Sequence, residues 1–169
     1  MTRQRRSTGA VAIATAGAVA VAAYATVAIL QILLWNPLAA APGLSLTEIH
    51  DEMAAAGERV FAPGVIGFLL VGPLLAVFLL IAARRPDTTR SATAIGYLGV
   101  LAGGAVAYFL ASFGPGMALA DTFLISGADA APAGWILLGV SAASVIALVA
   151  VVVSVALHGR ARPGTALST

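Results

Sequence analysis

Four stretches of the chain contain no Asp, Glu, Lys or Arg, and each is long and apolar enough to cross a lipid bilayer. They cover residues 9–35, 61–83, 91–113 and 133–157. The hydrocarbon core of a bilayer is about 30 Å thick, so a spanning helix needs roughly 20 apolar residues. In lipid the backbone must also satisfy its own hydrogen bonds, which an α-helix does within one segment. The sequence therefore predicts an all-α integral membrane protein whose four spans form a four-helix bundle.

Composition argues against a soluble protein. Of the 169 residues, 60% are hydrophobic and 9% are charged, whereas ordinary soluble domains are about 25% charged. A soluble domain of this size has too little interior to bury so much apolar surface. The chain has no cysteine, which excludes disulfides, thiolate catalysis and cysteine-ligated metal or iron–sulfur sites.

The charged residues predict the orientation of the spans. Eight of the nine arginines lie before the first span, between the second and third, or after the fourth. The remaining one, Arg59, falls on the opposite side. Six of the seven acidic residues fall there too: Glu48, Asp51, Glu52, Glu58, Asp121 and Asp129. Because short arginine-rich loops stay in the cytoplasm, both termini are predicted to be cytoplasmic.

This topology divides the chain into a membrane domain, residues 9–158, flanked by cytoplasmic segments 1–8 and 159–169. Outer loops are predicted at residues 36–60 and 114–132, and an inner loop at residues 84–90. All basic residues are arginine and alanine is abundant, a usage typical of GC-rich bacterial genomes. We therefore expect the protein in the bacterial plasma membrane, with the lipid bilayer as its surroundings.

The first span has a second interpretation. A basic start, an apolar run and the small residues Ala39 and Ala41 resemble a secretory signal with its cleavage site. However, the apolar run of about 25 residues is longer than the roughly 7–15 residues of a usual signal core. A retained first span is favoured, and its cleavage stays an open alternative.

Rows of small residues predict how the spans pack. Residues four apart share a helix face, and small side chains let membrane helices approach closely. We expect spans three and four to pack against each other along such rows, with a homodimer seam as the alternative. The rows are Gly99, Gly103, Ala107 and Ala111 in span three, and Gly139, Ala143 and Ala147 in span four.

Gly72 and Pro73 predict a kink in the second span. Proline has no N–H to donate to the carbonyl of Leu69, and its ring clashes with that turn. The kink can act as a hinge or line a polar site, but a static bend that improves packing is favoured. Gln31, near the outer end of span one, is interpreted as a tie between helices rather than a ligand group.

The first outer loop carries a short amphipathic helix. Ser45 followed by Glu48 forms a capping box, which predicts a helix over residues 46–56 ending near Gly57. Its apolar stripe is expected to cover the outer mouth of the bundle. The stripe comprises Leu46, Ile49, Met53, Ala56 and Val60. In the second outer loop, residues 117–126 are expected to form a short interfacial helix beside it.

Acidic residues of the two outer loops offer one candidate metal or catalytic site on the outer face. Glu48 and Glu52 lie one helical turn apart and can share a cation, and Asp121 or Asp129 from the second outer loop could complete the site. A solvated acidic face, with Glu48 as a capping charge, is favoured over this site.

The functional prediction rests on what the spans lack. Ionisable residues within spans mark proton relays and ion pathways, and none occurs here. No nucleophile and base can be paired into a catalytic constellation, and no cofactor or nucleic acid is expected. We therefore predict a non-enzymatic accessory, assembly or regulatory membrane subunit with a membrane-protein partner or a second copy. The alternatives are a small-solute transporter or channel, as a monomer or a dimer, and a membrane enzyme with an outer acidic or metal site. A deep polar cavity beside Pro73 would favour transport, and converging carboxylates would favour the enzyme.

Overall fold

The computed structural model describes the backbone of residues 2–160 and the side chains of residues 9–158, and every element in this part is helical. The side chains of the predicted cytoplasmic segments, residues 1–8 and 159–169, thus lie outside the described part of the chain. The all-α prediction is confirmed. The elements are α1 (Thr2–Leu30), η1 (Gln31–Trp35), α2 (Asn36–Ala40), α3 (Leu46–Ala55), α4 (Ala62–Leu69), α5 (Val71–Ala82), α6 (Arg90–Phe123) and α7 (Ala133–Arg160).

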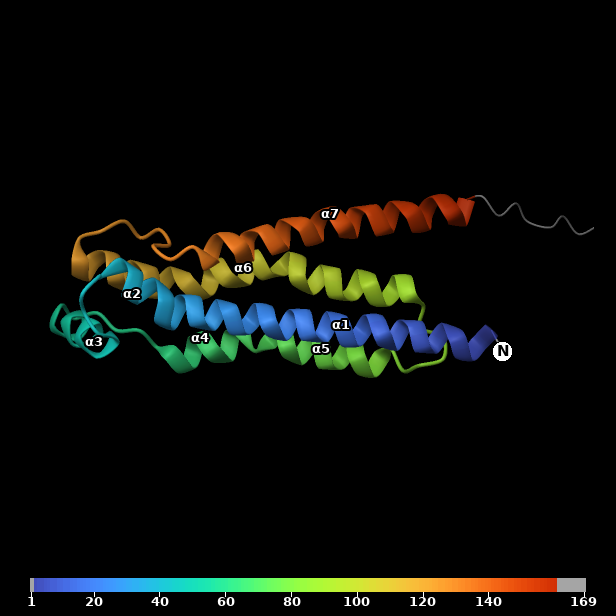
Figure 1. The fold of residues 1–169 in the computed structure, drawn as a ribbon, viewed down its shortest axis with the longest axis horizontal. Coiled ribbons are helices and arrows are strands. Elements are labelled where there is room, and N and C mark those ends of the chain that lie inside the picture. The colour runs from blue at the N-terminus through green and yellow to red at the C-terminus, as the bar shows by residue number, and fades with distance from the viewer. Residues whose placement is uncertain (1, 161–169) are drawn as a thin grey trace, which may run out of the picture.

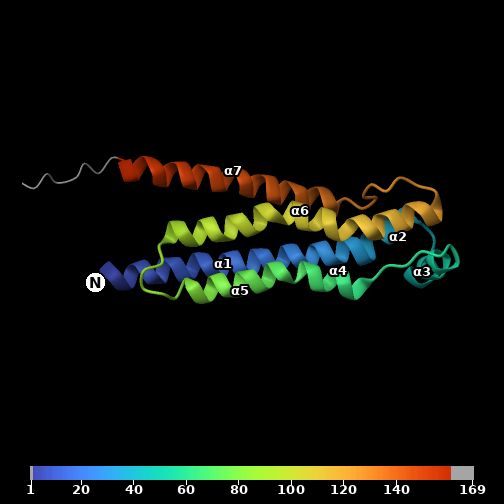
Figure 2. The same ribbon diagram turned by 180° about the vertical axis from the view of Figure 1, so that it is seen from behind.

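Four helical segments are long and apolar enough to cross a membrane, as predicted: Gly9–Ala40, Ala62–Ala82, Arg90–Phe123 and Ala133–His158. They lie side by side and alternate in direction (Figures 1 and 2). The N-terminus, the α5–α6 connection and the last turn of α7 lie at one end. The helices α2 and α3 and the α6–α7 loop lie at the other, here called the α3 end.

The helix α1 lies between the others and contributes to both main hydrophobic clusters. Near the α3 end, Ala28 of α1 and Ile32 of the following η1 pack with residues of α4, α6 and α7. Towards the opposite end, Ala14 and Val21 pack with α5 and α6. There the hydroxyl of Tyr97 donates a 2.7 Å hydrogen bond to the carbonyl of Ala76, joining α6 to α5. Small residues on α1 therefore let three helices approach it closely.

The first apolar helix continues to Ala40, beyond the predicted end of span one at residue 35. It does so through a π-helical turn, η1, in which the N–H of Asn36 bonds to the carbonyl of Gln31. Pro37 follows at the start of α2 and has no N–H, so an ordinary α-helical ladder cannot continue there. The wider turn accommodates the proline and places both Gln31 and Asn36 in the interior.

The second apolar segment is interrupted at Leu70, between α4 and α5. Pro73 cannot donate to the carbonyl of Leu69, and the helix resumes with the N–H of Leu74 bonded to the carbonyl of Leu70. The interruption thus lies about one turn before the proline. The sequence instead predicts the kink at Gly72 and Pro73 themselves.

The helix α6 does not end at residue 113, where the sequence places the start of the second outer loop. It continues through Gly114, Pro115 and Gly116 to Phe123 and ends at Leu124, which has a left-handed backbone with φ of 54°. The expected separate helix over residues 117–126 is therefore the last part of α6. Its Ala118 and Leu119 are buried against α3, and this packing outweighs the local preference of Gly-Pro-Gly for a turn.

The helix α3 covers the ends of α2 and α6. The capping box is present: the N–H of Ser45 donates to Glu48 at 2.7 Å, and the N–H of Glu48 donates to the Ser45 hydroxyl at 3.3 Å. Ile49 and Met53 of the predicted apolar stripe are buried against Ala118 and Leu119. Ala56, which the sequence placed on the same stripe, is exposed.

The helices α6 and α7 pack together, but not along the predicted rows. A Cβ added at Gly99, Gly103 or Gly139 meets no atom within 4 Å, and Ala143 is exposed. Ala107 is half-buried and Ala111 is buried. The α7 face that packs instead carries Leu137, Ser141 and Ser144. Serine is also small, and Ser141 donates a 2.9 Å hydrogen bond to the carbonyl of Leu101 on α6. This hydrogen bond joins the two helices, and an alanine or glycine side chain at position 141 could not form it.

Candidate functional site

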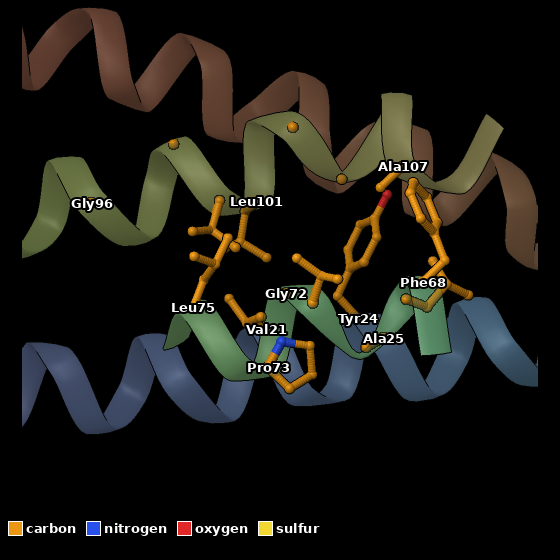
Figure 3. A pocket seen from close by; sticks show the side chains of 16 residues that line it. Val21, Tyr24, Ala25, Phe68, Gly72, Pro73, Leu75, Gly96, Leu101 and Ala107 are labelled. Carbon is orange, nitrogen blue, oxygen red and sulfur yellow. The ribbon is translucent and has the colours of Figure 1, made fainter. Parts of the chain in front are cut away.

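A groove of about 460 Å³ lies where α6 faces the interruption between α4 and α5. Figure 3 shows Phe68 and Leu75 on either side of Gly72, with Val21 and Tyr24 of α1 between them. The α6 side is mostly backbone and small residues: Gly96, Gly99, Val100, Leu101, Gly103, Gly104 and Ala107. The groove therefore combines the predicted row on α6 with the predicted kink on span two.

The glycines of this wall fall into two kinds. Gly104 and Gly96 are needed for internal packing, because an added Cβ would lie 2.7 Å from Tyr24 Cζ and 3.1 Å from a methyl of Leu79 respectively. Gly99 and Gly103 are not, because an added Cβ would meet nothing. The close approach that Gly99 and Gly103 permit is therefore not used by any of the described residues of this chain.

The groove is apolar and lies at the surface of the helices. Its one side chain with a polar atom is Tyr24, whose hydroxyl lies 3.1 Å from Ser141 Oγ. Because Ser141 gives its proton to the carbonyl of Leu101, the Tyr24 hydroxyl donates to Ser141. On the rim, Phe68 and Leu75 are about half exposed. The groove is therefore a hydrocarbon surface at the side of the helices. It is not the deep polar cavity that would favour transport.

A buried polar cluster lies at the α3 end and fixes the α6–α7 loop. Gln31 Nε2 donates to the carbonyl of Ala131 at 2.9 Å. Asn36 Oδ1 accepts from the N–H of Ala130 at 2.7 Å and of Ala131 at 3.3 Å. The hydroxyl of Tyr108 donates to Asp129 Oδ2 at 2.7 Å. Side chains from η1, α2 and α6 thus hold one short loop in place.

Gln31 does form a structural tie through its Nε2 atom, but it joins η1 to the α6–α7 loop and not one helix to another as expected. Gln31 is fully buried, and its Oε1 has no hydrogen-bond partner among the described residues. Sequence reasoning missed Asn36, Tyr108 and Asp129 as partners. The sequence signal for this cluster was Asn36, an amide beside a proline at the end of a long apolar helix, where a buried polar side chain needs a partner.

The acidic residues Glu48, Glu52 and Asp121 are not brought together as a site. Glu48 is engaged in the capping box, and hydrogen bonds from the backbone and hydroxyl of Ser45 lower the pKa of its carboxyl. Glu52 and Asp121 are exposed. Among the residues that the structure describes, no three His, Asp or Glu side chains are grouped so that they could hold a metal ion.

Comparison with known proteins found no matching family model, no similar curated protein and no similar solved structure.

Proposed function

We propose that this chain is an accessory subunit of the bacterial plasma membrane, a four-helix bundle that binds a transmembrane helix of a partner protein in the groove beside Gly99 and Gly103. Both termini lie in the cytoplasm. The charge pattern supports this orientation, because Arg84, Arg85 and Arg90 lie near the end opposite α3. Arginine-rich short loops stay on the cytoplasmic side.

The observation that carries the proposal is the pair of glycines with open space around them. Apolar surface does not by itself drive helices together in lipid, so association depends on close van der Waals packing at small residues. Gly99 and Gly103 lie one turn apart on the same face of α6 and border the groove. The exposed side chains of Phe68 and Leu75 on its other side would enclose an inserted helix face.

Transport of a small solute is the second candidate, supported by the interruption of the α4–α5 segment next to the groove. It ranks lower because the lining offers only the Tyr24 hydroxyl as a polar group, and that hydroxyl is already hydrogen-bonded. A membrane enzyme with an outer acidic site ranks third, because Asp121 does not join Glu48 and Glu52 in a group that could hold a metal ion.

The test is co-purification after mild detergent extraction, with matched variants. The double variant Gly99→Leu, Gly103→Leu fills the groove with two leucine side chains. They replace glycines at which an added Cβ meets no other atom of the described chain. Gly67→Leu is the control, because Gly67 also has open space around an added Cβ but does not line the groove. We expect a stoichiometric membrane partner with the unmodified protein and with Gly67→Leu, and its loss from the double variant.

Two outcomes would contradict the proposal. A partner retained equally by the double variant would place its binding surface elsewhere. An unmodified protein that purifies alone and monomeric would leave the groove without a protein occupant. If the only co-purifying chain has the same 16.8 kDa mass, the groove would belong to a seam between two copies.

A further inference from the structure

A second hollow, of about 370 Å³, lies beside Asp129, between the outer face of α6 and the α6–α7 loop. It is separate from the groove beside Gly99, since the two share no lining residue. Its walls are aromatic and apolar except for the Asp129 carboxylate and two hydroxyls. The lining residues are Tyr108, Phe109, Ser112, Phe113, Gly116, Met117, Gly127, Ala128, Asp129 and Leu138.

The Asp129 carboxylate is held in place before any ligand arrives. Tyr108, itself buried, donates its hydroxyl to Oδ2. Gly134 allows this approach, because an added Cβ would lie 2.9 Å from the Tyr108 hydroxyl and closer still to the carboxylate. The following residues, Ala130 and Ala131, are fixed by Asn36. A carboxylate accepts about four hydrogen bonds, so accepting positions remain for a ligand.

The charge around the hollow favours a cation. Among the residues whose side chains are described, no arginine lines it, and Arg59 borders two other hollows together with Glu58. At the α3 end, Arg59 is accompanied by six acidic residues: Glu48, Asp51, Glu52, Glu58, Asp121 and Asp129. A half-buried carboxylate without a basic neighbour is stabilised by an incoming positive charge.

The aromatic side chains define which kind of cation fits. Phe109 and Phe113 both border the hollow, with ring centroids 5.9 Å apart and planes tilted by 53°. Both are more than half exposed, so their faces are available to a ligand. Aromatic faces attract ammonium groups, above all quaternary ones. A hard metal ion instead needs six or more oxygen ligands, which one carboxylate cannot supply.

We propose that this hollow binds an organic cation, a quaternary or protonated amine with an apolar body. Asp129 is its counter-ion, and Phe109 and Phe113 pack against the ammonium and the apolar part. The site does not depend on the groove or on its partner helix.

The test uses two ligands of the same shape, phenyltrimethylammonium and neutral tert-butylbenzene. Binding is measured by titration calorimetry on the full-length protein in an uncharged maltoside detergent, which contains no lipid ammonium group to compete. We expect the cation to bind at least about tenfold more tightly than the neutral compound, the factor expected from one ion pair with cation–π contact.

Variants locate the site. Asp129→Asn keeps the size of the side chain and an acceptor for Tyr108, and should weaken cation binding by about tenfold or more. Asp121→Asn is the matched control, because Asp121 is an exposed carboxylate near the end of α6 that does not line the hollow; this variant should bind the cation as tightly as the unmodified protein. Phe113→Leu, at a largely exposed position, should weaken cation binding by about threefold to tenfold.

Equal affinity for the two ligands would overturn the proposal, and so would an unchanged affinity in Asp129→Asn. If Asp129→Asn does not fold, the ligand pair on the unmodified protein and the folded Phe113→Leu variant still decide the outcome.

Discussion

Adjacent glycines of α6 should respond in opposite ways to the same substitution. A methyl group added at Gly103 has open space, whereas one added at Gly104 would lie 2.7 Å from Cζ and 2.9 Å from the hydroxyl oxygen of Tyr24. Tyr24 cannot move away freely, since its hydroxyl is bonded to Ser141, which is bonded to Leu101. We predict that Gly103→Ala is tolerated and that Gly104→Ala is destabilising.

The magnitude follows from two contributions. Alanine is more favourable than glycine inside a helix by about 0.5–1 kcal/mol, and this applies equally at both positions. Overpacking at Gly104 adds a cost of about 1–3 kcal/mol. Because the helical preference cancels between the variants, their free energies of unfolding should differ by about 1–3 kcal/mol, with Gly103→Ala the more stable.

The assay is reversible unfolding by SDS in mixed micelles, followed by the fluorescence of Trp35 and Trp135. Equal unfolding free energies for the two variants would refute the packing described for Tyr24. A Gly103→Ala variant less stable than Gly104→Ala would mean that Gly103 is packed internally, and the groove would not be free.

Three further predictions concern hydrogen bonds. Asn36→Ala leaves two loop N–H groups without their acceptor and should cost about 1–3 kcal/mol of unfolding free energy in the same SDS assay; an unchanged value would contradict the loop attachment. Tyr97→Phe removes the bond to the carbonyl of Ala76 and should cost about 0.6 kcal/mol, and at most about 1.7 kcal/mol, the range measured between membrane helices; a larger loss would require another role for the hydroxyl. Because the pKa of Glu48 is lowered on folding, its contribution to α3 is present above the unfolded pKa of about 4.3 and is lost as the pH falls below it. After correction for the slower intrinsic exchange in acid, the amide protection factors of α3 should accordingly fall as the pH drops, and Glu48→Gln should lack this pH step; the same step in the variant would assign it to another carboxylate.

The four apolar segments could be predicted from the sequence because length and the absence of charge act locally. The capping box at Ser45 and Glu48 is local in the same way, and so is the effect of Pro73 on its own helix. The end of α6 could not be predicted like this. Gly114, Pro115 and Gly116 favour a turn locally, but burial of the following turns against α3 keeps the helix intact.

The rows of small residues illustrate a second limit. Gly99 and Gly103 permit close approach, but the pattern does not say which neighbour approaches. The α6–α7 seam uses Ser141, which adds a hydrogen bond to small size, and leaves the glycines facing the groove. The polar cluster was equally hard to predict, because Asn36 and the N–H groups of Ala130 and Ala131 are far apart in the sequence and meet only once the helices are packed.

Whether the groove beside Gly99 and Gly103 receives a partner's helix can be measured within the membrane of intact cells. A photo-crosslinking amino acid is placed either at Leu75, which lines the groove, or at Leu74, its exposed neighbour that does not. A protein adduct of defined mass from position 75, absent from position 74 and lost when Gly99 and Gly103 are both leucine, is the predicted result. Adducts with lipid alone at position 75, or the same protein adduct from both positions, would contradict it.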